Sequence, residues 1–161
     1  MSSPSQPAKN SSIVSIRAMT SSDAPAVVSI LRESPEASLW AENSIVESAN
    51  CGMAWVAEQD SNVAGFLIGR GVADEFEILN VAVAHAYRRR GIAGQLVRVA
   101  LRCSRRAGAK RAYLEVRASN GAAIFLYSRH GFVQNGRRER YYQYPAEDAL
   151  LFSVEMNSMQ Q

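Results

Sequence analysis

The stretch from Ile78 to Arg106 constrains the fold more than any other part of the chain. Residues 78–84 are almost continuously apolar, which is typical of a strand buried on both faces. The next segment, HAYRRRG, holds three consecutive arginines and Gly91. A run of helical periodicity follows, and its apolar face consists of Ile92, Leu96, Val99, Ala100 and Cys103. The sequence thus predicts a strand, a glycine-containing turn and an amphipathic helix in succession.

This succession predicts an anion site at the start of the helix. The first turn of a helix presents unpaired N–H groups and the positive end of the helix dipole. Gly91 and Gly94 leave the backbone open to a ligand, Ala93 adds little bulk, and the arginines add charge. The spacing is neither that of a P-loop nor that of the dinucleotide motif GxGxxG. A basic, solvated helix start is the alternative interpretation.

Strand and helix signals alternate along the rest of the chain. Strands are expected at residues 13–19, 53–59, 62–71, 75–84, 111–117, from 132 onward and at 148–156. Helices are expected at residues 21–34, 42–49, 92–107 and 119–131. Ser119 is the expected N-cap of the last helix and Gly131 its stop. This order predicts an α/β or α+β fold around one sheet, with parallel or near-parallel crossovers at the last two helices.

Length and composition predict one globular domain, which we expect over residues 13–157. The chain has 161 residues, 47% of them hydrophobic and 20% charged. Residues 1–12 lack the apolar core of a signal peptide and are expected to be a disordered tail, with 158–161 as a short C-terminal tail. No apolar stretch reaches the ~18 residues of a membrane helix, and Cys51 and Cys103 lack metal-site spacing. We therefore expect a cytoplasmic protein without metal or membrane contact.

Three segments resemble a known family. RRRGIA matches the Q/R-x-x-G-x-G/A motif of the GNAT N-acetyltransferases at Arg88, Gly91 and Ala93. YLEVRASNGAAIFLYSRHGF, residues 113–132, resembles the signature of the RimI branch, the ribosomal-protein-alanine N-acetyltransferases. Residues 136–156 resemble the ending of the same branch. The resemblance implies the GNAT fold: a mixed central sheet of about seven strands with helices on both faces, splayed between strands four and five.

The resemblance also implies a reaction and a binding site. An acetyl group would pass from acetyl-CoA to the N-terminal α-amine of a protein, in this branch a small-subunit ribosomal protein. Main-chain groups of the arginine-glycine turn would hold the pyrophosphate, and the fourth strand would contact the pantetheine and acetyl group. The residues implied to bind the cofactor are Val81, Ala82, Val83, Arg88, Arg89, Arg90, Gly91, Ile92, Ala93, Gly94, Asn120 and Tyr127.

Glu115 is the candidate general base. Acetyl transfer needs a neutral amine, and an α-amino group, with a pKa of about 7.7 to 8, asks only for a modest base. A carboxylate on an interior strand costs energy unless it is paired or useful. The resemblance gives Glu115 the role of proton acceptor, through a water molecule. An ion pair with Arg117 or another arginine is the alternative.

Tyr127 is the candidate general acid. It follows Asn120 by two helical turns, so both lie on one helix face about 10 Å apart. The resemblance implies that Tyr127 protonates the CoA thiolate, while a main-chain N–H of the fourth strand stabilises the oxyanion. A tyrosine in this position is otherwise more often a core or rim residue.

Three aromatic residues are candidates for acceptor recognition: Trp40, Tyr141 and Tyr142. The branch carries a Pro-Trp pair where this chain has Leu39 and Trp40, and packing is the alternative role of each aromatic residue. Asp74, Glu75 and Glu77 could attract a basic peptide or form a solvated turn.

Other activities stay open, since fold alone does not determine substrate. They are acetylation of a lysine side chain or small amine, and non-catalytic binding of acyl-CoA by a regulatory module. Nucleic-acid binding is not expected, because the net charge is only +3 and no reader motif is present.

Overall fold

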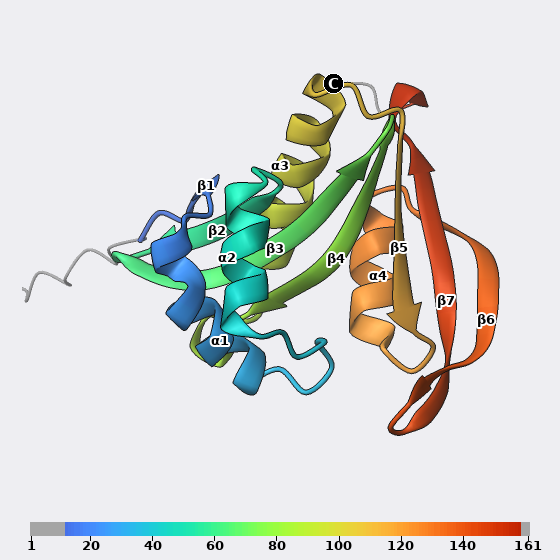
Figure 1. Ribbon diagram of the computed structural model, residues 1–161, viewed down its shortest axis with the longest axis horizontal. Coiled ribbons are helices and arrows are strands. Elements are labelled where there is room, and N and C mark those ends of the chain that lie inside the picture. Colours follow the sequence, from blue (N-terminus) through green and yellow to red (C-terminus); the bar gives the residue numbers. More distant parts are fainter. Residues whose placement is uncertain (1–11, 159–161) are drawn as a thin grey trace, which may run out of the picture.

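The computed structural model describes residues 12–158 and contains a seven-stranded mixed sheet with helices on both faces (Figure 1). The strand order is β1-β2-β3-β4-β5-β7-β6, and every neighbouring pair is antiparallel except β4 and β5. The predicted fold class is confirmed. The expected tails at residues 1–11 and 159–161 lie outside the described residues.

The order of elements is the predicted one. The strands are β1 (Ser15–Ala18), β2 (Ala54–Gln59), β3 (Asn62–Val72), β4 (Glu75–Val83), β5 (Arg111–Arg117), β6 (Val133–Gln143) and β7 (Ala146–Glu155). The helices are α1 (Ala24–Arg32), α2 (Glu42–Asn50), α3 (Ile92–Arg106) and α4 (Gly121–Arg129), with 3-10 turns at Ser21–Asp23, His85–Tyr87 and Met156–Ser158. β6 extends well beyond the residues that signalled it, because its exposed, charged middle lacks the apolar alternation of a half-buried strand.

Each face of the sheet has its own apolar core. α3 and α4 cover one face, where Leu96, Leu114 and Phe152 are buried. α1 and α2 cover the other, where Ile45 and Phe66 are buried. The buried stripe of α3 is broader than predicted: Val97, Leu101 and Ser104 are buried, while Val99 and Cys103 are only partly covered. The two cores hold the sheet from both sides, while its middle strands, β4 and β5, separate at one end.

β4 contains a bulge. Ile68 and Gly69 of β3 pair with Asn80 and Ile78, so Leu79 has no partner on β3. Before the bulge, Ile78 packs in the α3 core; after it, Ala82 packs under α1 and α2. β4 is covered on both faces, as predicted: Ile78 lies in one core, Ala82 lies in the other, and none of its residues is exposed. Its residues alternate between buried and partly buried, because part of one face borders a cavity.

β4 and β5 separate after four residue pairs. The parallel pairing joins Glu75–Ile78 to 111–114 and then stops, as the two diverging arrows of Figure 1 show. The N–H of Ala84 donates to the carbonyl of Ala64 on β3 over 2.8 Å. Because main-chain groups of an antiparallel strand alternate in direction, those of Val81 and Val83 point away from β3, into the gap. The splayed sheet thus presents the backbone of β4 to a ligand.

Within residues 12–158, no helix combines the length and apolar character that crossing a bilayer requires.

Candidate active site

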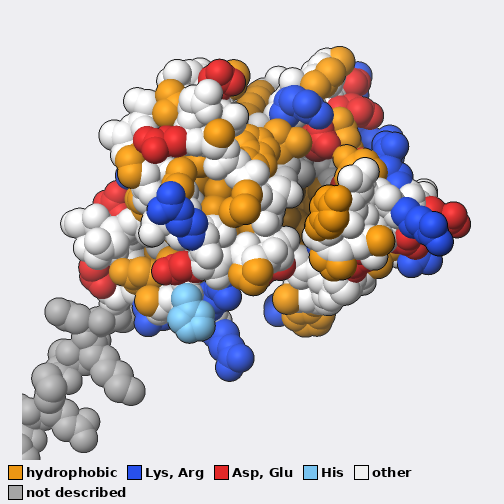
Figure 2. Space-filling view, turned by 60° about the horizontal axis from the view of Figure 1, so that its bottom comes forward, with side chains coloured by type: hydrophobic (Ala, Val, Ile, Leu, Met, Phe, Trp, Pro, Cys, Tyr) orange, Lys and Arg blue, Asp and Glu red, His pale blue; other side chains and the backbone are white. Residues whose placement is uncertain are grey.

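A cavity of about 1040 Å³ opens where β4 and β5 separate. Figure 2 looks into this side of the molecule and shows a hollow with hydrophobic side chains at its walls. The cavity is lined by the ends of β4 and β5, the first turns of α3, the length of α4, the loop after α1 and the β6–β7 hairpin. The predicted cofactor-binding residues that line it are Val81, Ala82, Val83, Arg88, Arg89, Gly91, Ile92, Ala93, Gly94 and Asn120.

The turn before α3 has the geometry of an anion site. Gly91 is the N-cap of α3, with a left-handed φ of 75°, and Arg89 has a φ of 64°. A Cβ on Gly91 would meet no atom within 4 Å, so the turn needs glycine for its backbone conformation and not for space. The N–H groups of the first α3 turn have no partner within the helix. The positive end of the helix dipole lies at the same place, beside the cavity. Such a concave set of N–H groups suits a phosphate.

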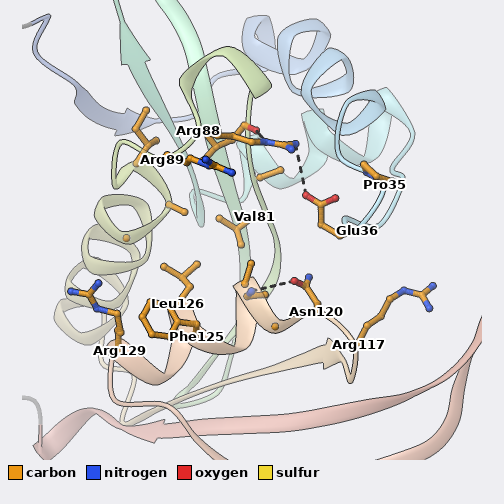
Figure 3. A pocket seen from close by; sticks show the side chains of 18 of the residues that line it. Pro35, Glu36, Val81, Arg88, Arg89, Arg117, Asn120, Phe125, Leu126 and Arg129 are labelled. Atoms are coloured by element: carbon orange, nitrogen blue, oxygen red, sulfur yellow. Dashed lines mark hydrogen bonds and ion pairs between the residues drawn. The ribbon is translucent and has the colours of Figure 1, made fainter.

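The side chains of the three consecutive arginines go in different directions. Arg88 donates from Nε to the carbonyl of Val83 over 3.0 Å and extends toward the loop after α1 (Figure 3). Arg89 lines the cavity. Arg90 lies outside the cavity lining, 3.5 Å from the side-chain oxygen of Gln59 and with its guanidinium over the ring of Tyr87. The geometry therefore favours only Arg89 as a charged phosphate contact within this turn.

Sequence reasoning missed the basic residues that line the same cavity from other elements: Arg98, Arg117, Arg129 and His130. An ideal Cβ on Gly94 would lie 3.4 Å from the His130 ring, so the start of α3 and the end of α4 are in close contact. The packing of α3 beside α4, next to the end of β5, brings these residues together, and no sequence motif signals it.

A smaller cavity of about 120 Å³ adjoins the large one. The residues that line both are Pro35, Glu36, Val81, Arg117, Asn120 and Ala123. Glu115, Tyr127 and Tyr142 line only the smaller one. The two predicted catalytic residues are thus brought together in the smaller cavity, and neither of them lines the large one.

Glu115 lies one residue beyond the last β5 pair with β4. Arg138 on β6 donates to its carboxylate over 2.9 Å. The alternative of an ion pair is therefore observed, with Arg138 as the partner; Arg117 instead pairs with Glu147 at 3.4 Å. The Arg138 side chain is 56% exposed, so solvent screens the pair and the carboxylate stays accessible at the cavity wall.

Tyr127 is 5% exposed and lies edge-on to Phe132. Burial raises the pKa of Tyr127 well above its usual value, so its hydroxyl stays protonated at neutral pH. Among residues 12–158, nothing forms a hydrogen bond with that hydroxyl. The side chain is therefore a buried proton donor whose hydroxyl has no acceptor among the described residues.

Asn120, and not the predicted Ser119, is the N-cap of α4. Its side-chain oxygen accepts a hydrogen bond from the N–H of Ala123 over 3.1 Å (Figure 3). Asn120 can fill this place because its backbone lies just outside the helix, where the side chain reaches back to the third N–H. The cap leaves the amide NH₂ of Asn120 available at the cavity.

The acceptor candidates separate into two groups. Tyr142 lines the small cavity and stacks on the Arg117 guanidinium at 4.1 Å. Tyr141 packs against Tyr142, and the charge of Glu115 raises the pKa of Tyr141. Trp40 lines neither cavity and is partly buried against the α1–α2 core.

The acidic cluster of the β3–β4 turn is paired. Asp74, Glu75 and Glu77 have ion-pair partners in Lys110, Arg111 and Arg70, respectively. These pairs favour the interpretation of a solvated turn over that of a peptide-binding patch.

Comparisons with known proteins agree with this geometry. Residues 15–132 match the acetyltransferase (GNAT) family. The chain is 31% identical over 144 residues to the alanine N-acetyltransferase of ribosomal protein bS18 from Escherichia coli K12, covering 86% of this chain and 95% of the relative. It is 36% identical over 102 residues to a putative enzyme of the same kind from Bacillus subtilis 168, covering 63% and 68%. The crystal structure of the Escherichia coli enzyme superposes with a TM-score of 0.79 at 30% identity, over 92% of this chain and 97% of that one.

Proposed function

The chain belongs to the acetyltransferase (GNAT) family, and on that premise we propose that this N-acetyltransferase acetylates the N-terminal α-amine of a protein. The first candidate acceptor is a small-subunit ribosomal protein that begins with alanine, the acceptor named for its relatives. The observation that carries the proposal is the junction of the two cavities, where a phosphate-suited turn, a carboxylate and a buried tyrosine meet. Such an acceptor would place the reaction in the cytoplasm, and residues 13–157 would form the single domain that performs it.

The donor substrate acetyl-CoA is assigned to the large cavity. Its pyrophosphate would accept hydrogen bonds from the first turn of α3, with Arg89 adding charge. Its pantetheine arm would follow the gap beside β4 toward the smaller cavity. Val81 lines both cavities, and its N–H points into the gap, so we assign it to the carbonyl oxygen that becomes negative during attack.

The acceptor amine is assigned to the small cavity. Glu115 would take the amine proton through a water molecule, and Tyr127 would protonate the departing thiolate of CoA. Tyr141 and Tyr142 are assigned to contacts with the acceptor peptide. The limited volume of the cavity favours a small first residue, such as alanine, over a bulky one.

The test is an acetylation assay read by mass spectrometry with acetyl-CoA and two peptides. One peptide carries the N-terminus of a ribosomal protein that starts with alanine; the other has a blocked N-terminus and internal lysines. We expect one acetyl group, on the alanine amine only. Acetylation of lysine alone would contradict the proposed acceptor, and acetylation of neither peptide would reject protein N-termini of this class.

The Glu115→Gln variant tests the base in the same assay. We expect turnover to fall about a hundredfold with a small change in the KM for acetyl-CoA, since proton abstraction and not donor binding is impaired. The matched control is Glu75→Gln, which neutralises an ion-paired strand glutamate outside both cavities. Unchanged turnover of Glu115→Gln across pH would remove Glu115 as the base.

A further inference from the structure

We propose that Arg88 is a positioning residue that fastens the acceptor side of the site to the donor strand, and not a phosphate ligand. The acceptor loop is defined as residues 34–38, between α1 and α2. Its members Pro35, Glu36, Ala37 and Ser38 line the small cavity, and Pro35 and Glu36 also border the large one. The inference rests on the proposed function, because it takes that cavity as the place of the acceptor amine.

The Arg88 guanidinium connects three segments of chain. Its Nε donates to the carbonyl of Val83, at the end of β4, over 3.0 Å. Its Nη2 donates to the carbonyl of Glu33 and to Oγ of Ser34, each over 3.1 Å. Glu36 of the acceptor loop lies 3.8 Å away (Figure 3). A guanidinium engaged with β4, the end of α1 and the acceptor loop is not directed at the phosphate turn.

A second contact holds the far end of the acceptor loop to the same strand. Asn80 of β4 is buried, and its side-chain NH₂ donates to the carbonyl of Ser38 over 2.8 Å. Ser34, at the near end, is also buried and donates to the carbonyl of Ile30. Both ends of the loop are therefore anchored, one by β4 itself and the other by the turn that follows it.

The anchoring fixes the wall of the acceptor cavity relative to the strand that would bind the donor. β4 offers its backbone to the donor, while the loop fastened to β4 forms a wall of the acceptor cavity. If the contact between Arg88 and the Ser34 end were lost, the loop would be mobile in the free enzyme. Each acceptor would then have to order the loop on binding, and the free-energy cost of that ordering would weaken acceptor binding. Donor binding would be affected less, because only Pro35 and Glu36 of the loop border the large cavity, while the main-chain N–H groups of the α3 turn and Arg89 remain in place.

The lysine substitution separates charge from geometry. Arg88→Lys keeps a positive charge beside the phosphate turn, but an ammonium on a flexible stem cannot reproduce the planar set of guanidinium contacts. We expect the acceptor KM to rise about tenfold and the Kd of acetyl-CoA, measured by calorimetry, to stay within about twofold. Hydrogen exchange at residues 34–38 should be faster than in the wild type. Ser34→Ala, which removes one acceptor, should raise the acceptor KM by a smaller factor.

Two further variants serve as comparisons. Arg89→Ala should weaken acetyl-CoA binding and leave exchange in the acceptor loop unchanged. Arg102→Lys, an exposed α3 substitution outside both cavities, should leave the acceptor KM, the Kd of acetyl-CoA and the hydrogen exchange of the acceptor loop unchanged.

The inference is overturned if Arg88→Lys leaves both acceptor KM and loop exchange unchanged, or if Arg88→Lys weakens acetyl-CoA binding as strongly as Arg89→Ala does. If the wild type acetylates neither peptide, the proposed function fails separately, and loop exchange still decides the role of Arg88: faster exchange supports it and equal exchange overturns it.

Discussion

At the scale of single residues, the signature segments predicted which side chains gather at the site, but not where each one points. Glu115, Asn120 and Tyr127 were singled out by the segment that resembles the family signature, and all three line the small cavity. The directions of the arginines could not be predicted, because a turn has no periodicity, and the left-handed φ of Arg89 turns the chain between Arg88 and Arg90. Trp40 lies in the irregular segment between α1 and α2 and is partly buried against their core, which favours packing, the alternative role given to it.

Tyr127→Phe should slow transfer about tenfold to a hundredfold, because the leaving thiolate loses its proton donor. The Kd of acetyl-CoA should be nearly unchanged. Pre-steady-state kinetics with the alanine peptide would measure the first quantity and calorimetry the second. Equal transfer rates in both proteins would discard Tyr127 as the acid.

The same variant carries a pH signature. Because burial raises the pKa of Tyr127 in the folded state, the unfolded chain loses this proton first, near its usual pKa of about 10. The stabilisation is therefore complete below that pH and is lost as pH rises above it. Urea unfolding at pH 8 and pH 11 should show a smaller alkaline loss of stability for Tyr127→Phe than for the wild type.

At the scale of elements, the succession of strands and helices was predictable, since apolar periodicity and glycine stops mark each one. The bulge at Leu79 was not, because one extra residue shifts the alternation of β4 without changing its composition. Apolar residues stand at consecutive positions because β4 packs on both faces, with Val81 and Val83 against one core and Ala82 in the other. β6 was underestimated because an exposed, charged edge strand carries little apolar signal.

The turn before α3 gives a prediction at this scale. Gly91→Ala should weaken acetyl-CoA binding several-fold, because alanine disfavours the left-handed backbone that aims the N–H groups. Gly108→Ala is the matched control: Gly108 has a φ of 103°, free space for a Cβ and a position at the opposite end of α3. Both variants should be less stable by about 1 kcal/mol, but only Gly91→Ala should bind the donor less tightly. Equal Kd values for the two would place the phosphates elsewhere.

At the scale of the whole molecule, a core packs on each face of the sheet, while a cavity opens between the central strands β4 and β5. The sequence predicted one sheet with helices on both faces, because buried strands alternate with amphipathic helices. The depth and outline of the cavities depend on how α3, α4 and the hairpin of β6 and β7 come together, which no local pattern contains.

Acetyl-CoA should therefore stabilise the whole fold. At a hundred times its Kd, a ligand of the native state adds about 2.7 kcal/mol, which corresponds to a Tm increase of about 5 to 10 °C for a chain of this size. Thermal unfolding with acetyl-CoA, and with adenosine at the same concentration as a phosphate-free control, would measure it. A constant Tm at saturating acetyl-CoA would mean that the gap is not its site.

The position of Leu79 determines whether the sheet opens between β4 and β5. Ile78 is the last residue of β4 that pairs with β5, and the unpaired Leu79 follows at once. A bulge bends and twists its strand, so the extra residue turns β4 away from its parallel neighbour at this point. A chain shortened by that single residue would keep every acid, base and arginine, yet β4 could continue its ladder along β5 and close the sheet. Catalysis by this protein thus depends on the number of residues in β4 as well as on the chemistry of its side chains.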